Sequence, residues 1–121
     1  MIKEIDSVLK LDRNKQYEYF VKKVVDFEEI WSLRDDEGWA SLGDNENEFL
    51  PLWPKKEFAD RCISEEWSSY YAEAIDLEEF IEDWIPGLIE DNIKITLMWN
   101  EGRGIEIPCE SLKSDLEMKN Y

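Results

Sequence analysis

Apolar residues in the first quarter of the chain recur at helical spacing. Ile2, Ile5 and Leu9 lie three and four residues apart, which predicts a short helix at the start of the chain. A second helix follows, with Asp12 or Asn14 in the position of its N-terminal cap. Its apolar stripe consists of Tyr17, Phe20, Val21 and Val24. The chain therefore begins with two amphipathic helices.

The next segment alternates short apolar runs with turn-forming residues, which is typical of strands. Residues 30–33 and 39–42 are separated by a charged turn that ends on Gly38, so we predict a β-hairpin. A third strand spans residues 49–53. Because Pro51 and Pro54 lack an N–H, we expect this strand to lie at a sheet edge or to end early. Pro54 suits the first turn of a helix that runs to about Ile63, and residues 69–74 form a short extended piece.

Asp76 begins the clearest predicted element, a long amphipathic helix. Asp76 and Glu79 have the spacing of a capping box, and Ile75 and Phe80 occupy the positions of a hydrophobic staple. Pro86 predicts a kink or a restart, because proline cannot donate to the carbonyl four residues earlier. The apolar stripe comprises Leu77, Phe80, Ile81, Trp84, Ile85, Leu88 and Ile89.

The remaining residues predict a second hairpin and a final helix. Asn92 suits the end of the preceding helix, and apolar and polar residues then alternate over 93–100, the pattern of a half-buried strand. A turn over 101–104 leads to a strand over 105–107, and residues 110–118 form a helix. We therefore predict an α+β fold with one domain over residues 1–121. Its mostly antiparallel sheet, two hairpins plus a further strand, packs against several helices.

Charge is concentrated in the middle of the chain. The 121 residues carry 30 acidic and 14 basic side chains, a net charge of −16. Residues 27–92 hold 20 of the acidic and 4 of the basic side chains, and the segments on either side are each within one charge of neutrality. An acidic surface repels nucleic acid and anionic membranes, so we expect neither as a direct partner. It favours basic partners, although solubility alone also explains it.

Features of secreted or membrane proteins are not found. Two cysteines in a chain with 43% hydrophobic residues do not resemble a disulfide framework. Residues 1–10 alternate charged and apolar side chains, unlike a signal peptide. No stretch approaches the roughly 20 apolar residues of a membrane span. We expect a cytoplasmic protein and leave its oligomeric state open.

Residue types that carry catalysis are scarce. The chain has no histidine, which excludes the usual catalytic triads and every His-containing metal site. Cys62 falls on the inner side of its helix, and Cys109 follows a strand end where exposure is expected, but neither has a histidine as base. The carboxylates at positions 44, 46 and 48 alternate like calcium ligands, yet Phe49 stands where an EF-hand loop needs glycine. We expect no cofactor, no metal site and no catalytic residue.

Two acidic segments are candidates for protein binding: the turn of the first hairpin and the outer face of the helix after Asp76. Like charges at i and i+4 destabilise an isolated helix by a few tenths of a kcal/mol per pair, and this helix has no basic residue to offset them. A merely solvated face is the alternative interpretation. The candidate contact residues are Asp35, Asp36, Glu37, Glu78, Glu79, Glu82 and Asp83.

Three tryptophans form a second candidate site. Trp31, Trp39 and Trp53 lie on three strands that we predict to pair, so their side chains can meet. Such a cluster is either part of the core or the lining of a ligand pocket.

Several short motifs resemble a known family. They are Trp31-Ser32-Leu33, Gly38-Trp39-Ala40, Pro51-Leu52-Trp53-Pro54, Lys56-Glu57-Phe58-Ala59, Leu77-Glu78-Glu79-Phe80, Trp84-Ile85-Pro86 and the stretch 104–112. Together they resemble the family called domain of unknown function 2750 over nearly the whole chain. The resemblance implies a small single-domain bacterial protein and no established activity, so it carries over no catalytic residue. The order of elements is also similar to the enhanced serine sensitivity family, a likeness of fold alone.

These observations predict a non-enzymatic module that presents an acidic face to a basic protein. An immunity or antitoxin-like protein is one case of such a module. The alternative is a small-molecule-binding or enzymatic domain with an aromatic pocket, in which carboxylates act as acid and base. A third interpretation is a nucleic-acid mimic, whose carboxylates take the places of phosphates.

Overall fold

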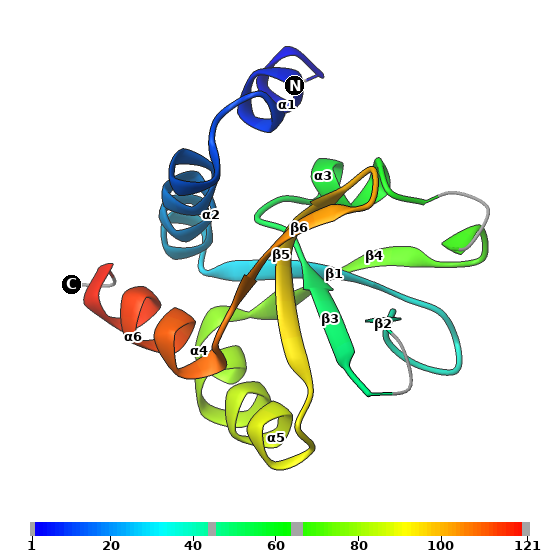
Figure 1. Cartoon of the computed structure of the whole chain (residues 1–121), viewed down its shortest axis with the longest axis vertical. Helices are drawn as coiled ribbons and strands as arrows, with labels where there is room; N and C mark the ends of the chain where they lie inside the picture. Colours follow the sequence, from blue (N-terminus) through cyan, green and yellow to red (C-terminus); the bar gives the residue numbers. More distant parts are fainter. Residues whose placement is uncertain (1, 44–45, 64–66, 120–121) are drawn as a thin grey trace.

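The computed structural model describes residues 2–43, 46–63 and 67–119 of the chain (Figure 1). Its elements follow in the order α1 (Ile2–Leu9), α2 (Arg13–Phe27), β1 (Glu29–Arg34), β2 (Leu42–Gly43), β3 (Glu48–Leu52), α3 (Lys56–Asp60), β4 (Tyr71–Asp76), α4 (Leu77–Glu79), the π-helical segment η2 (Phe80–Trp84), α5 (Ile85–Glu90), β5 (Lys94–Asn100), β6 (Arg103–Ile107) and α6 (Cys109–Lys119). The mixture of helices and strands confirms the predicted α+β class.

The described strands form two sheets that are joined at one point. β1 pairs with β4 in an antiparallel sheet, and the second sheet has the order β2-β3-β5-β6. In the second sheet β3 and β5 are parallel, whereas the other pairs are antiparallel. The main chains of Trp31 and Trp53 exchange two hydrogen bonds of 2.8 Å, which link β1 to the residue after β3. The pairing is mostly antiparallel, as predicted, but the parallel pair was not expected.

The predicted first hairpin is only partly correct. Its turn forms, because the N–H of Asp35 donates to the carbonyl of Gly38 at 2.9 Å. β1, however, pairs along its whole length with β4, the segment predicted as a short extended piece. This pairing places Ile30 opposite Ile75, and both are buried, which stabilises β1 and β4 through a cross-strand apolar contact. Residues 42–43 pair with β3 instead.

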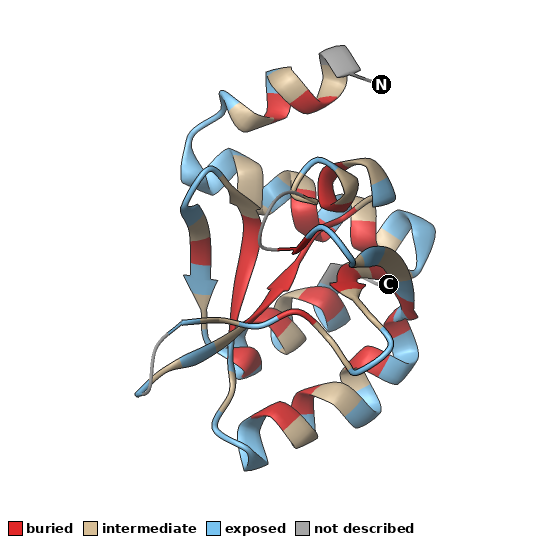
Figure 2. Cartoon of the chain, turned by 90° about the vertical axis from the view of Figure 1, so that its right-hand side faces the viewer, coloured by how far each residue is buried: buried red, intermediate tan, exposed pale blue. Residues whose placement is uncertain are grey.

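Helices cover the strands from different sides. In Figure 1, α2 lies to the left of the strands, α6 at the lower left, and the helix from Leu77 to Glu90 below them, and α3 packs on β1 and β4. The buried residues lie along the central strands and the helix sides that face them (Figure 2). The largest fully buried side chains are Trp53, Phe20, Phe80, Ile30, Leu33, Leu52, Ile85, Ile95, Leu97, Leu112, Leu116 and Val24.

β5 is more deeply buried than its alternating sequence predicts. Ile95 and Leu97 are buried as expected, but Thr96 and Met98 on the other face are buried too. β3 and β6 flank β5 on both sides, and Gly104 of β6 has no side chain to keep Thr96 at a distance. Met98 has a φ of 58°, within an irregularity that interrupts the pairing of β5 with β6 between Leu97 and Asn100. The prediction of a half-buried strand was therefore wrong.

Pro51 lies inside the sheet in an unexpected position. β3 is an inner strand, yet β2 pairs with it only as far as Phe49, so Pro51 lies beyond the stretch paired on that side. Ser32 from β1 approaches here, and its hydroxyl donates to the carbonyl of Pro51 at 2.6 Å. A proline is tolerated because its missing N–H falls where the ladder with β2 has ended.

Candidate functional site

The helix that starts after Asp76 carries the first acidic segment. Asp76 caps it as predicted, since its carboxylate accepts the N–H of Glu79 at 3.1 Å. The side that faces the core is anchored by Leu77, Phe80, Ile85 and Leu88, all buried. We call the opposite side the acidic face; it consists of Glu78, Glu79, Glu82 and Asp83, and all four side chains are exposed. The anchoring holds these four carboxylates on the outer side of the helix.

A π-helical turn interrupts this helix just before Pro86. Residues 80–84 adopt the wider turn, and the helix then continues over α5. Proline cannot donate to the carbonyl of Glu82, and a π turn accommodates that missing bond within a continuous helix. The predicted interruption is therefore confirmed, in the form of a π turn. Ile89, predicted to face the core, is 46% exposed, because the helix ends one residue later and turns away through Asn92, which has a φ of 57°.

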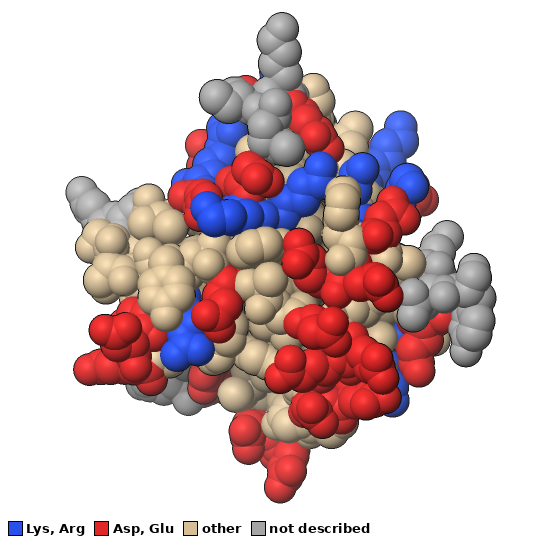
Figure 3. Space-filling model, turned by 180° about the vertical axis from the view of Figure 1, so that it is seen from behind, with Lys and Arg blue, Asp and Glu red and all other residues tan. Residues whose placement is uncertain are grey.

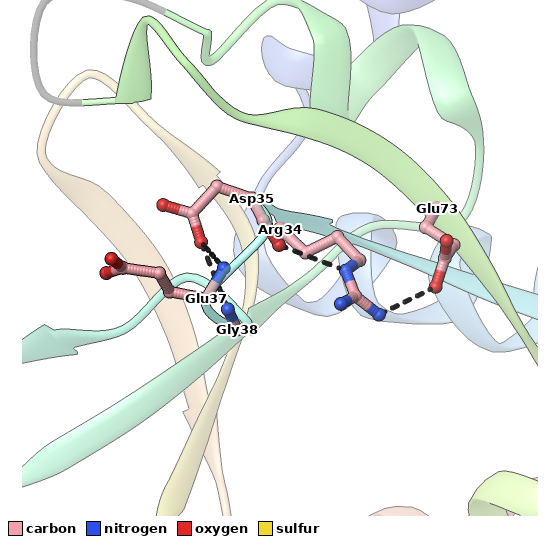
Figure 4. A network of polar contacts seen from close by, with 5 residues as sticks. All are labelled: Arg34, Asp35, Glu37, Gly38 and Glu73. Carbon is pink, nitrogen blue, oxygen red and sulfur yellow. Dashed lines mark hydrogen bonds and ion pairs between the residues drawn. The ribbon is translucent and has the colours of Figure 1, made fainter.

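The second acidic segment is the turn after β1 (Figure 4). The carboxylate of Asp35 accepts the N–H groups of Glu37 and Gly38 at 2.9 and 3.0 Å, so Asp35 stabilises the turn itself. Asp36 and Glu37 are exposed. Arg34 precedes the turn, but its guanidinium pairs with Glu73 at 3.4 Å, and no other Lys or Arg in the described part of the chain pairs with Asp36 or Glu37.

Two tryptophans that follow the acidic segments in the sequence contact each other. Trp39 follows the turn and Trp84 follows Asp83, and their rings meet edge to face with centroids 4.9 Å apart. Seen from behind, carboxylates cover the lower right of the molecule, where the helix after β4 lies, and Lys and Arg side chains gather in the upper half (Figure 3). Among the described residues, no Lys or Arg forms an ion pair with any of the seven predicted contact residues.

The three candidate pocket tryptophans have different environments. Trp53 is 1% exposed, its ring contacts Trp67, and its indole N–H donates to the carbonyl of Trp99 at 3.0 Å. Trp31 is next to Trp53 through the main chain, but its indole N–H points to Glu29 at 3.3 Å. Trp39 packs on Trp84 instead. Trp53 is thus a core side chain, and the ring contacts found for Trp39 and Trp53 are with other tryptophans.

A groove in the described part of the chain lies elsewhere. It has a volume of about 1090 Å³ and is formed by the link between α1 and α2, by β2 and β3, and by the β5–β6 hairpin. Its lining includes Phe49 and Trp99 but none of Trp31, Trp39 and Trp53. Sequence reasoning missed this groove because it depends on which distant segments the fold brings together.

Neither cysteine has the properties of a nucleophile. Burial raises the pKa of the Cys62 thiol from 9.0 to about 11, and the thiol donates to the carbonyl of Trp99 at 3.1 Å. Cys109, which we expected to be exposed, is buried at the start of α6, and burial together with the charge of Glu110 raises its pKa. The expectation for Cys109 was wrong because α6 begins at this residue and turns the side chain inward. A thiol with a raised pKa forms little of the reactive thiolate near neutral pH.

Residues 2–43, 46–63 and 67–119 contain no group of three or more His, Cys, Asp or Glu side chains placed to hold a metal ion. The loop with carboxylates at positions 44, 46 and 48 falls partly outside the described residues, since residue 44 is not described. None of the described helices is long and apolar enough to cross a membrane.

Fold and sites together describe a small α+β protein with an acidic helix whose other side is anchored in the core. The chain matches the family described as protein of unknown function (DUF2750) over residues 17–116, and it belongs to that family. This confirms the family suggested by the sequence motifs. No curated protein matches the chain. The match does not include α1, the first residues of α2 or the last residues of α6.

Proposed function

We propose that this domain is a non-enzymatic module that binds a basic protein through its acidic face. The observation that supports the proposal is the arrangement of Glu78, Glu79, Glu82 and Asp83. They are exposed together on a helix whose other side is anchored in the core, and no described Lys or Arg pairs with them. Asp36 and Glu37, in the turn that leads to Trp39, are also exposed and have no ion pair with a described Lys or Arg.

The proposal explains why the helix keeps charges that weaken it. Glu78 with Glu82, and Glu79 with Asp83, are like-charge pairs at i and i+4, and each costs a few tenths of a kcal/mol in an isolated helix. The first turn tolerates acidic residues because they oppose the positive end of the helix, but Glu82 and Asp83 lie beyond that turn. A basic partner would neutralise all four carboxylates at once.

A partner of this kind would be recognised mainly through its charge pattern. Opposite charges steer two proteins together, so association is fast and slows as salt screens the attraction. An immunity or antitoxin-like protein that blocks a cationic toxin is one such module. The proposal places this encounter in the bacterial cytoplasm.

Affinity capture from an extract of the source organism tests the proposal. The bait is the wild-type protein or a variant in which the acidic face is neutralised: Glu78→Gln, Glu79→Gln, Glu82→Gln and Asp83→Asn. A control bait carries Glu18→Gln, Glu101→Gln, Glu110→Gln and Glu117→Gln, which removes the same number of exposed negative charges from other surfaces. We expect one basic protein to be retained by the wild type and the control but not by the face variant.

The retained protein is then purified, and its affinity for each bait is measured. We expect the face variant to bind at least tenfold more weakly, and the wild-type association rate to fall as salt is raised. Equal affinity for all three baits, or no partner that depends on the acidic face, contradicts the proposal. If DNA displaces the partner, the acidic face acts as a nucleic-acid mimic instead.

A further inference from the structure

The groove of about 1090 Å³ contains two arginines that the protein itself leaves unused. The sequence has four arginines: Arg34 pairs with Glu73 and Arg61 pairs with Asp6. Arg13 and Arg103 form no ion pair among the described residues, and both line the groove. They come from opposite parts of the chain, Arg13 from the start of α2 and Arg103 from the start of β6.

Unpaired arginines are unexpected in a chain with 30 acidic and 14 basic side chains. Three carboxylates line the same groove, and two of them have other partners. Asp12 accepts the N–H of Lys15 at 2.9 Å, and Glu106 faces the ammonium group of Lys94 at 4.0 Å. Glu101 lies in the exposed turn of the β5–β6 hairpin. The two guanidinium groups are therefore available to an external anion, which they can bind through paired N–H donors.

The rest of the lining suits an apolar body rather than a second charge. Phe49, Trp99 and Leu42 are half-buried along the groove, and Leu9 from the end of α1 forms part of its wall. Aromatic and aliphatic side chains that surround a few fixed polar groups are typical of small-molecule sites. The net charge of −16 disfavours a polyanion, whereas it repels a ligand with a single negative charge only weakly.

We propose that the groove binds a small organic monoanion, one with an aromatic or aliphatic body and a single carboxylate or sulfonate group. The acidic group is held by Arg13 and Arg103, and the body packs on Phe49 and Trp99. This site is separate from the acidic face and does not depend on its function.

The fluorescent probe 8-anilinonaphthalene-1-sulfonate has this chemistry and tests the proposal. We expect saturable binding to the folded protein. In a ¹⁵N-labelled sample, the amide signals of Gly102, Gly104 and the neighbouring hairpin residues should shift most. Arg13→Gln and Arg103→Gln should each weaken binding about tenfold, the usual effect of losing one charge-assisted hydrogen-bonding group.

Two controls separate the arginines from charge in general. Lys15→Gln removes the same charge from α2, and Lys113→Gln removes it from α6; neither lysine lines the groove, and both variants should bind like the wild type. The uncharged probe N-phenyl-1-naphthylamine should bind equally to wild type and arginine variants. Circular dichroism checks that each variant is folded. If Arg13→Gln or Arg103→Gln does not fold, Arg13→Lys or Arg103→Lys is used in its place. Amide shifts outside the groove, or arginine variants that bind as tightly as the lysine controls, overturn the proposal.

Discussion

The hydroxyl of Ser32 links the β1–β4 sheet to the sheet that contains β3. No other side-chain hydrogen bond found between described strand residues joins these two sheets. Ser32 is fully buried in β1, and its hydroxyl donates to the carbonyl of Pro51 in β3. The adjacent main-chain bonds between Trp31 and Trp53 fix the same junction. A buried carbonyl that loses its donor still bears the full free-energy cost of desolvation. This single hydroxyl therefore contributes to the stability of the junction.

Ser32→Ala should lower the free energy of unfolding by about 1–2 kcal/mol, because the carbonyl of Pro51 stays buried without this donor. Urea denaturation followed by tryptophan fluorescence measures the change. Ser114→Ala is the matched control, since Ser114 is exposed on α6 and its replacement should change the free energy by less than about 0.5 kcal/mol. If the two variants are equally stable, the junction does not depend on this hydrogen bond.

The positive φ of Met98 has a similar local explanation. A non-glycine residue at φ 58° carries strain on the order of 1 kcal/mol. The irregularity in β5 brings the carbonyl of Trp99 to the indole N–H of Trp53 and to the thiol of Cys62. Trp53 is buried and Cys62 is half-buried, and this one carbonyl accepts a hydrogen bond from each, which offsets the strain. The unusual backbone thus gives two side chains beneath it a hydrogen-bond acceptor.

At the scale of elements, α1 depends on polar contacts as much as on packing. It buries Ile5 and Val8, while its Glu4 accepts hydrogen bonds from Tyr19 of α2 at 2.6 Å and from Lys55 before α3 at 3.1 Å. These two donors lower the pKa of the Glu4 carboxyl below its ordinary value of 4.5. Burial, and then the bond to Glu4, raises the pKa of the Tyr19 hydroxyl. The docking of α1 is therefore sensitive to pH.

The sign of that sensitivity follows from which protonation state the fold prefers. A lowered carboxyl pKa stabilises the fold above the ordinary value, and the contribution is lost as pH falls below about 4.5. Glu4→Gln should therefore be less stable than wild type at pH 7, and the difference should shrink toward pH 3. Because Glu4 is 37% exposed, solvent screens the contact and the difference at pH 7 should not exceed about 1 kcal/mol. Urea denaturation at several pH values measures it; a difference that is constant with pH contradicts the assignment.

Predictions from the sequence succeeded for elements whose signals are local. The cap at Asp76, the interruption near Pro86 and the β5–β6 hairpin were all recognisable from neighbouring residues. Strand partners could not be recognised in this way, because the pairing of β1 with β4 and of β3 with β5 depends on residues far apart in the chain. The acidic face could be predicted for the same local reason, since helical periodicity placed its carboxylates together. The groove could not be predicted, because three segments that are far apart in the sequence form it.

At the scale of the whole molecule, the charge of −16 is divided unevenly over the surface. Ion pairs that involve α1, α2 and α3 use several of the basic residues, and the acidic face has no such compensation among the described residues. Like charges on one surface repel one another and lower the stability of the folded state. Dissolved salt reduces that repulsion, since its screening length falls to about 10 Å at 0.1 M.

The free energy of unfolding should therefore rise with salt, by on the order of 1 kcal/mol between low ionic strength and about 0.5 M sodium chloride. Most proteins held together by surface ion pairs would show the opposite tendency. The variant with a neutralised acidic face should respond less than the wild type, and the variant with four replacements on other surfaces serves for comparison. Urea denaturation at each salt concentration provides the measurement. A wild-type stability that falls with salt would show that ion pairs outweigh the repulsion.

The pairing of β1 with β4 and of β3 with β5 also matters while the protein is being made. Register partners such as Glu29 and Asp76, or Phe49 and Lys94, are far apart in sequence. During synthesis, β1 and β3 leave the ribosome well before their partners have been translated. Their backbone edges stay open during that interval, when another chain can pair with them. The strand order of this small protein thus makes the second half of the chain responsible for closing sheets that the first half begins.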